Sequence, residues 1–384
     1  MGPKALIAVL ACAAASFSGC AHLQLAERFS AGAGDWPMYG RAQDRANSAA
    51  SIVEPPLEAA WEYDASAGFG TSSAAAAGGF VLAANLRGEV HAVDIMNGEG
   101  RGSRDFGSAI SGTPVISGDT LYAALAHDEH SLVAYALHTG SVVWQAALGD
   151  IESSPLLSEG RLFAASLHGT MFSVDRRTGA ILWRYRIPEA PLIHSSPASD
   201  GAMVVFGCDN GSVCALSAPD GRLLWKARTR AAVLASPVIT DGAVFVGSQD
   251  SSFYAFDTAA GGLLWSQRLG AKIFSSAAVR SGRVYAGTSG GEFFCLDART
   301  GSVVWRFSMN SVPGAAPVAS GDIVYAGCLD RTLYAFEAAT GRIAWKCALA
   351  GRLKTAPIVY RDLLILLVED RSVIAMRHSG GQGR

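Results

Sequence analysis

Short apolar runs alternate with turns along most of the chain, and the pattern is clearest in residues 276–307. Four apolar runs there are separated by glycine-containing turns at 281–282, 289–291 and 300–301. Glycine tolerates the positive φ angles of tight turns, and short apolar runs between such turns are typical of β-strands. No long stretch of helical period interrupts them. The pattern predicts a unit of four antiparallel strands.

This unit recurs at intervals near 40 residues. Its first marker is a glycine followed four residues later by tryptophan, with the tryptophans at Trp144, Trp183, Trp225, Trp265, Trp305 and Trp345. Their spacings are 39, 42, 40, 40 and 40 residues. Trp61 precedes Trp144 by 83 residues, or two repeats, and Gly102 takes the place of the intervening tryptophan. The period therefore extends over most of the chain.

A second marker, a small residue followed by proline, supports the same count. It lies at Pro114, Pro155, Pro197, Pro237, Pro317 and Pro357, and Ala74 and Ala277 stand at the proline position of the two remaining copies. Four-stranded units at this period are typical of propeller blades, each of which buries its faces only against its neighbours. The repeats predict an all-β, eight-bladed β-propeller of four-stranded antiparallel blades.

The two ends of the chain complete one blade between them. The last unit, residues 356–376, has three strands and lacks the final tryptophan strand. The first tryptophan strand, residues 59–63, has no unit in front of it. Joining them removes two open strand edges. We expect the N-terminal strand to close the ring by completing the last blade.

The repeat resembles the pyrroloquinoline-quinone-type propeller repeat. The resemblance rests on the glycine-to-tryptophan ending and on strands such as 254–257 and 334–337, and it covers about residues 57–377. It implies blade-docking roles for the tryptophans, namely Trp61, Trp144, Trp183, Trp225, Trp265, Trp305 and Trp345. A large aromatic at a fixed register is also a core residue on physical grounds.

The N-terminal residues have the pattern of a targeting signal. Lys4 precedes a short apolar stretch that ends in Phe17-Ser18-Gly19-Cys20, which resembles the lipobox of bacterial lipoproteins. This predicts a signal peptide over 1–19 and lipidation of Cys20, and Ala21 favours the outer membrane in proteins of that kind. An ordinary secretory signal is the alternative. We expect a tether and lead-in over 20–56, with 35–40 on the propeller rim, and a disordered tail over 378–384.

Composition and charge argue against several classes of protein. The 384 residues carry 31 Lys and Arg against 33 Asp and Glu, and this balance argues against nucleic-acid binding through a broad basic face. No apolar stretch reaches about 18 residues, which excludes a multi-pass membrane protein. Five cysteines follow the predicted lipidation site, none in a metal-binding spacing. Cys208 and Cys214 flank a turn. They could form a disulfide or remain two buried free thiols, and the sequence is compatible with both.

Catalytic signals are weak. Quinoprotein dehydrogenases share the repeat, but they resemble one another in adjacent cysteines and a calcium site, and this chain has no adjacent cysteines. The acidic residues of this chain recur at turns, where the Asp side chain accepts hydrogen bonds from nearby backbone N–H groups. Zinc-protease and P-loop motifs are also missing. We therefore expect no catalytic residues and no cofactor.

Two loops depart from the repeat. Four extra residues in the second unit fall around His127, Asp128, Glu129 and His130. These side chains are weak candidate ligands for a divalent metal, and a solvated turn is the alternative.

The other departure is the longest connection between units, residues 187–194, which two prolines stiffen. Leu192 and Ile193 are expected at its tip as an anchor for a protein partner, with His194 beside them. The alternative is that both aliphatic side chains lie in the core.

A lipobox combined with a single eight-bladed domain resembles the BamB-like lipoprotein family of the outer-membrane β-barrel assembly machinery. The resemblance implies a non-enzymatic scaffold, lipid-anchored at the periplasmic face of the outer membrane and monomeric within a hetero-complex. Its partner would be the barrel insertase or its periplasmic modules. One alternative is a periplasmic propeller lipoprotein that binds a small molecule, a cell-wall polymer or a metal in its central channel. The other is a divergent quinone-dependent dehydrogenase.

Overall fold

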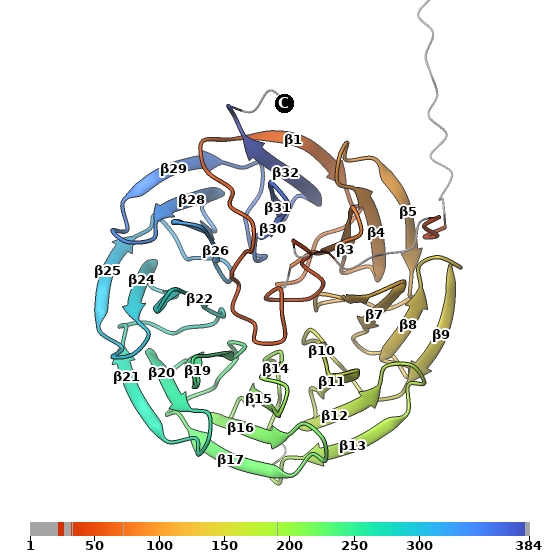
Figure 1. Ribbon diagram of the computed structural model, residues 1–384, viewed down its shortest axis with the longest axis horizontal. Coiled ribbons are helices and arrows are strands. Elements are labelled where there is room, and N and C mark those ends of the chain that lie inside the picture. The colour runs from red at the N-terminus through yellow and green to blue at the C-terminus, as the bar shows by residue number, and fades with distance from the viewer. Residues whose placement is uncertain (1–21, 27–31, 33, 72, 190, 381–384) are drawn as a thin grey trace, which may run out of the picture.

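The computed structural model describes residues 22–26, 32, 34–71, 73–189 and 191–380. Within them, 32 strands form eight four-stranded antiparallel sheets arranged around a central axis (Figure 1). This is an eight-bladed β-propeller, as the repeats predicted. The predicted signal peptide and Cys20 lie outside the described residues, as do residues 381–384.

Each blade places one strand at the channel and one at the outer rim. The innermost strands are β2 (Ala75–Ala77), β6 (Val115–Ser117), β10 (Leu156–Ser158), β14 (Ala198–Ser199), β18 (Val238–Thr240), β22 (Ala278–Arg280), β26 (Val318–Ser320) and β30 (Ile358–Tyr360). The second strands are β3 (Phe80–Ala84), β7 (Thr120–Ala124), β11 (Arg161–Ser166), β15 (Met203–Gly207), β19 (Ala243–Gly247), β23 (Arg283–Gly287), β27 (Ile323–Gly327) and β31 (Leu363–Leu367).

The third strands are β4 (Glu89–Asp94), β8 (Leu132–Ala136), β12 (Thr170–Asp175), β16 (Ser212–Ser217), β20 (Ser252–Asp257), β24 (Glu292–Asp297), β28 (Thr332–Glu337) and β32 (Ser372–His378). The outermost strands are β5 (Gly100–Asp105), β9 (Ser141–Ala146), β13 (Ile181–Arg186), β17 (Leu223–Arg228), β21 (Leu263–Arg268), β25 (Val303–Ser308), β29 (Ile343–Ala348) and β1 (Leu57–Asp64). Blades 1 to 7 run from β2–β5 to β26–β29. Blade 8 combines β30–β32 with β1.

The N-terminal strand closes the ring. β1 pairs antiparallel with β32, with Trp61 opposite Ala375, so the first and last strands of the chain share one sheet. The closure prediction is confirmed. His378, which we had placed in a disordered tail, is the last residue of β32.

Tryptophans of the outer strands lie at the seams between blades. Trp265 in blade 5 donates its indole N–H to the carbonyl oxygen of Ala298 in blade 6, at 2.9 Å. The equivalent bond to the next blade is made by Trp61, Trp144, Trp183, Trp225 and Trp305. Trp345, in blade 7, is half-buried and packs against an apolar cluster that includes residues of blades 7, 8 and 1. A repeated aromatic thus meets a repeated turn at each of these seams.

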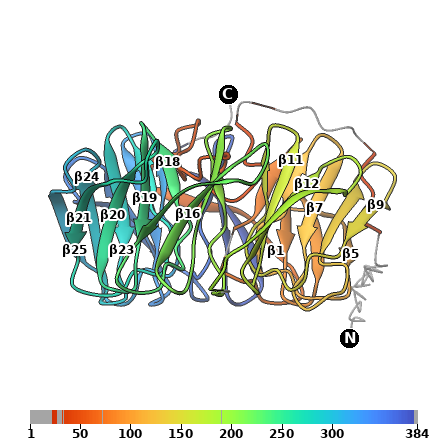
Figure 2. The ribbon, with the colours of Figure 1, turned by 90° about the horizontal axis from the view of Figure 1, so that it is seen from below.

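The segment 34–56 lies across the centre of the ring, near its upper end in Figure 2. Its backbone is hydrogen-bonded to the innermost strands of six blades, through Ala76, Ile116, Ser199, Ile239, Val279 and Ala319. Trp36 is fully buried in this segment. The predicted rim position of residues 35–40 is therefore wrong. Unpaired N–H groups of the innermost strands face the channel, and this segment satisfies them.

Arg45 links this segment to two blades. Its side chain is fully buried and donates to the carbonyl oxygens of Ser154 and Pro155 in blade 3 and of Pro197 in blade 4. It also donates to the carbonyl oxygen of Tyr39. Burial lowers the pKa of Arg45 to about 9, so the guanidinium stays charged at neutral pH. We call residues 34–56 the inner strap.

Candidate functional site

One end of the ring carries the turns between second and third strands and the connections between blades; we call it the loop face. The connection between β13 and β14, singled out by its length, lies here. Leu192 is 44% exposed, whereas Ile193 is fully buried in the core beneath it. The prediction that both residues are exposed at the loop tip is wrong for Ile193.

Ile193 is buried because it occupies a core position of the repeat. It stands four residues before Pro197, and the residues at the same register are Ile110, Ile151, Val233, Ile273, Pro313 and Leu353. Gly207, at the end of β15, leaves no room for a side chain, since an added Cβ would lie 2.2 Å from a methyl carbon of Val233. Ile273 meets Gly247 in the same way. The register of this aliphatic residue was readable from the sequence.

Leu192 is held on a fixed backbone. Its carbonyl oxygen accepts the N–H of Asp209, from the turn between β15 and β16, at 3.0 Å. The Asp209 carboxylate in turn lies 3.0 Å from Nδ1 of His194. Nε2 of His194 lies 4.0 Å from Oε2 of Glu152, on the preceding connection. Leu192 is therefore an exposed aliphatic side chain flanked by fixed polar groups.

The predicted metal candidates do not converge. His127 turns toward Asp150, with 3.6 Å between Nδ1 and the carboxylate, and His168 approaches the other oxygen of Asp150 at 3.3 Å. Asp128 accepts the backbone N–H of His130 at 2.7 Å, which is a local turn bond. Across the described part of the chain, no group of three or more His, Cys, Asp or Glu side chains is placed to hold a metal. The extra residues form a polar turn, with Glu129 on it.

Cys208 and Cys214 are buried and their thiols are free. Of the two possibilities, a disulfide and two buried thiols, this structure shows two buried thiols.

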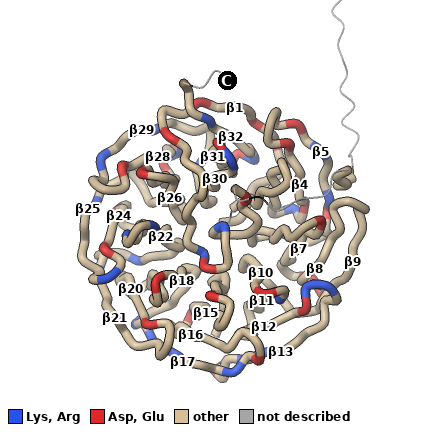
Figure 3. Tube along the Cα trace, viewed as in Figure 1, with Lys and Arg blue, Asp and Glu red and all other residues tan. Residues whose placement is uncertain are grey.

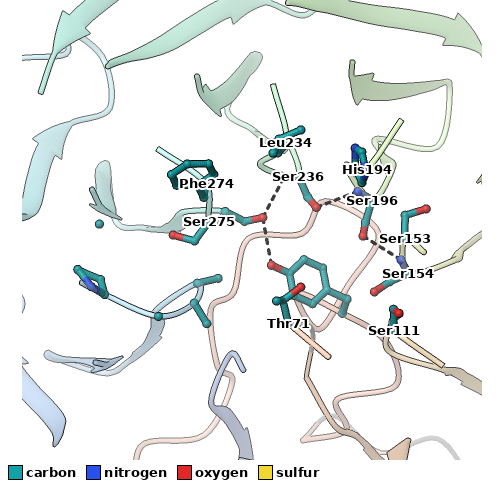
Figure 4. Close-up of a pocket in the computed structure, with 18 of the residues that line it drawn as sticks. Thr71, Ser111, Ser153, Ser154, His194, Ser196, Leu234, Ser236, Phe274 and Ser275 are labelled. Atoms are coloured by element: carbon teal, nitrogen blue, oxygen red, sulfur yellow. Dashed lines mark hydrogen bonds between the residues drawn. The ribbon is translucent and has the colours of Figure 1, made fainter. Parts of the chain in front are cut away.

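The channel holds a cavity of about 430 Å³ that reaches the loop face (Figure 4). Its mouth is lined by one repeat position, three residues before the proline marker. In seven blades this position is occupied by Thr71, Ser111, Glu152, His194, Leu234, Phe274 and Gly314, which we call the mouth ring. In blade 8 it is Lys354, which pairs with Glu369 and is not part of the described cavity lining. The scaffold repeats, but this position carries a different side chain in nearly every blade. These residues were not predicted as one site from the sequence, although the repeat register places them at equivalent positions.

Below the mouth ring, hydroxyl groups link successive blades. The N–H of Thr113 donates to Oγ of Ser154 at 2.8 Å, and the N–H of Ser154 donates to Oγ of Ser196 at 3.0 Å. The series continues from Ser196 to Ser236 and from Ser236 to Ser276. These are the small residues before the proline marker. They are small because each must fit between two adjacent blades.

The inner strap closes the deep end of the cavity. Tyr39 lines it and donates its hydroxyl to Oγ of Ser276 at 3.0 Å. Burial raises the pKa of Tyr39, so it remains a neutral phenol. Arg45 lies behind, 5.5 Å from the ring centre of Tyr39. The cavity is therefore open at the loop face and floored at the other end.

Among the described residues, Lys and Arg are interspersed with Asp and Glu around the ring (Figure 3). Within the part of the chain that the structure describes, no helix combines the length and apolarity that a membrane crossing requires.

Comparison with known proteins identifies relatives of two kinds. The chain is 27% identical over 190 residues to the outer membrane protein assembly factor BamB of Yersinia pestis, covering 42% of this chain and 47% of the relative. The chain thus spans about half the length of that curated relative. The crystal structure of BamB from Moraxella catarrhalis matches with a TM-score of 0.73 at 19% identity, over 84% of this chain and 99% of that one.

A quinohemoprotein alcohol dehydrogenase from Comamonas testosteroni matches with a TM-score of 0.77 at 13% identity, over 92% of this chain and 82% of that one. At these identities the solved structures share the fold alone. The family model described as outer membrane protein assembly factor BamB matches residues 42–185, 168–307 and 294–382. The resemblance seen in the repeats is confirmed, and the chain belongs to the BamB family of pyrroloquinoline-quinone-like propellers.

Proposed function

We propose that this chain is a non-enzymatic scaffold lipoprotein of the outer-membrane β-barrel assembly machinery. It is held at the periplasmic face of the outer membrane by a lipid on Cys20. Its partner is the barrel insertase or the periplasmic modules of that subunit, which it binds as a single copy within a hetero-complex. Membership of the BamB family supports the assembly role.

The observation that carries the proposal is the exposed Leu192 on a fixed loop. Ile187 and Ile193 are buried on either side of it, so the loop is anchored at both ends. Lys226 pairs with Glu189 on the same loop, with 2.9 Å between Nζ and Oε1. The carbonyl oxygen of Leu192 accepts the N–H of Asp209, so this backbone position is already ordered before binding. An ordered aliphatic side chain loses little conformational entropy on binding, which favours a contact with a protein partner.

The test is affinity purification of the tagged, lipidated chain from outer membranes solubilised in detergent. We expect barrel-assembly subunits to be recovered in stoichiometric amounts. Leu192→Asp should reduce that recovery without changing the thermal midpoint of unfolding. Leu264→Asp is the matched control, because Leu264 is also exposed but lies on the outer rim. Recovery of no assembly subunit with the unmodified chain would contradict the scaffold proposal.

Lipidation has a separate test. Cys20→Ala should release the protein from the membrane fraction into the soluble periplasmic fraction. Mass spectrometry of the N-terminal peptide should show the lipid only in the unmodified chain.

The residues present do not fit the alternative of a quinone-dependent dehydrogenase. Pyrroloquinoline quinone carries several carboxylates, yet the described residues that line the channel cavity include no Lys or Arg. Glu152 is the single carboxylate in that described lining, and none of the five free cysteines belongs to it. We therefore assign no step through this cofactor.

A further inference from the structure

The channel cavity has the features of a binding site that the scaffold proposal does not use. Its volume of about 430 Å³ lies within the range of small-molecule sites, which is roughly 300–1,000 Å³. Tyr39 floors it and the mouth ring opens to solvent. A ligand could enter only from the loop face, because the inner strap closes the other end.

Hydroxyl groups dominate the interior of the cavity. Ser154, Ser196 and Ser236 each accept one backbone N–H. A hydroxyl can also donate, and among the contacts of the described residues none of these three does so. The wall therefore offers hydrogen bonds to a ligand rich in acceptors and donors.

The mouth is apolar on one side and polar on the other. Phe274 is 46% exposed there and Leu234 lies beside it, while His194 lies on the far side of Leu234 (Figure 4). Glu152, on the next connection beyond His194, lines the same cavity. With no Lys or Arg in the described lining, and with the Glu152 carboxylate at its edge, an anion would be repelled. A neutral ligand with one apolar face and several hydroxyls matches both sides.

We propose that the channel cavity binds a neutral sugar unit. The C–H face of a pyranose ring lies against Phe274, and its hydroxyls bind Glu152 and His194. The sugar is either a free disaccharide or the end of a glycan strand. This binding is independent of partner capture through Leu192.

Calorimetric titration of the purified full chain tests the proposal, in a detergent without a sugar headgroup. The probes are N,N′-diacetylchitobiose, cellobiose and maltose, each up to about 20 mM, which covers the millimolar affinities typical of small neutral ligands. Sedimentation with purified peptidoglycan sacculi is the second arm and distinguishes a glycan polymer from a free disaccharide. We expect binding in at least one arm.

Phe274→Ala should weaken that binding about tenfold, a loss of about 1.4 kcal/mol. Glu152→Gln, which keeps the shape of the side chain and removes its charge, should weaken it several-fold. Leu264→Ala is the control and should leave it unchanged. Circular dichroism establishes that each variant is folded. The proposal is overturned if no sugar binds in either arm, or if binding is the same in folded Phe274→Ala and Glu152→Gln as in the unmodified chain.

Discussion

Gly301 of blade 6 lies against the indole ring of Trp265 in blade 5, so closely that an added Cβ would lie 2.5 Å from Cε3 of that ring. The same contact joins Gly341 to Trp305 and Gly261 to Trp225. The glycine and the tryptophan that meet thus belong to different blades at each of these seams. Along the chain, the glycine and tryptophan of one marker lie in the same blade. In the folded ring, however, the tryptophan contacts the glycine of the next blade.

Gly301→Ala should therefore destabilise the ring. The residue has a φ of +73° and no space for a methyl group, so we expect a loss of about 2–4 kcal/mol in the free energy of unfolding. Gly282→Ala is the matched control, since Gly282 has a φ of +71° but nothing within 4 Å, and it should lose only about 1 kcal/mol. Denaturant unfolding measures both. Equal losses would show that the contact with Trp265 contributes nothing.

The inner strap should be an integral part of the fold. Trp36→Ala removes a fully buried indole and should cost about 3–5 kcal/mol of unfolding free energy. Met96→Ala, at a side chain that is 78% exposed, should stay within about 0.5 kcal/mol of the unmodified chain. A Trp36→Ala variant as stable as the Met96→Ala variant would show that the strap is dispensable for stability.

Ile193 and Leu192 are neighbours with opposite predicted effects. Ile193→Ala leaves a cavity in the core and should cost about 2–4 kcal/mol, while Leu192→Ala should change stability by less than about 0.5 kcal/mol. Thermal unfolding of the two variants checks this. The partner-binding role proposed for the loop rests on Leu192, and a large stability loss in Leu192→Ala would count against it.

The seam between blades 8 and 1 should weaken in mild acid. His91 is buried there, with Nδ1 3.0 Å from the hydroxyl of Tyr63 and Nε2 3.3 Å from the Glu89 carboxylate. Burial lowers the pKa of His91. Burial alone would raise the pKa of Glu89, but hydrogen bonds from Ser66, Asn85 and His91 lower it to about 2. Glu89 therefore stays ionised while His91 titrates.

As the pH falls below about 6.5, the unfolded chain takes up a proton at His91 before the folded chain does, so stability falls. The thermal midpoint of the unmodified chain should drop between about pH 7.5 and pH 5.5. The drop should be smaller in His91→Gln, which cannot titrate. An identical drop in both proteins would assign the acid sensitivity to other histidines.

The repeat period made the architecture predictable. Trp265 and its equivalents recur at a fixed distance from a glycine, and Pro237 and its equivalents mark the start of each blade. Each blade needs the same contacts with its neighbours, so the same residue types return at the same register. Ring closure followed as well, because a missing strand at one end matched an extra strand at the other.

Residues outside the repeat were placed only by the tertiary structure. The inner strap has no repeat of its own, and its hydrogen-bond partners are distributed over six blades that are distant in sequence. The local pattern of apolar and polar residues therefore could not show whether the inner strap lies at the rim or in the channel. Leu192 and Ile193 are equally apolar, and the structure was needed to show that the repeat position of Ile193 lies in the core while Leu192 is exposed.

The amino-acid sequence by itself determined eight blades, their strand order and the closure of the ring, because these depend on contacts that every blade repeats. The tertiary structure decided what lies in the channel. Thr71, Phe274 and the other members of the mouth ring are up to about 240 residues apart in sequence and meet only when the ring closes. A mouth formed by one residue from each of seven blades has no local signature, since each contributor is an ordinary loop residue in its own repeat.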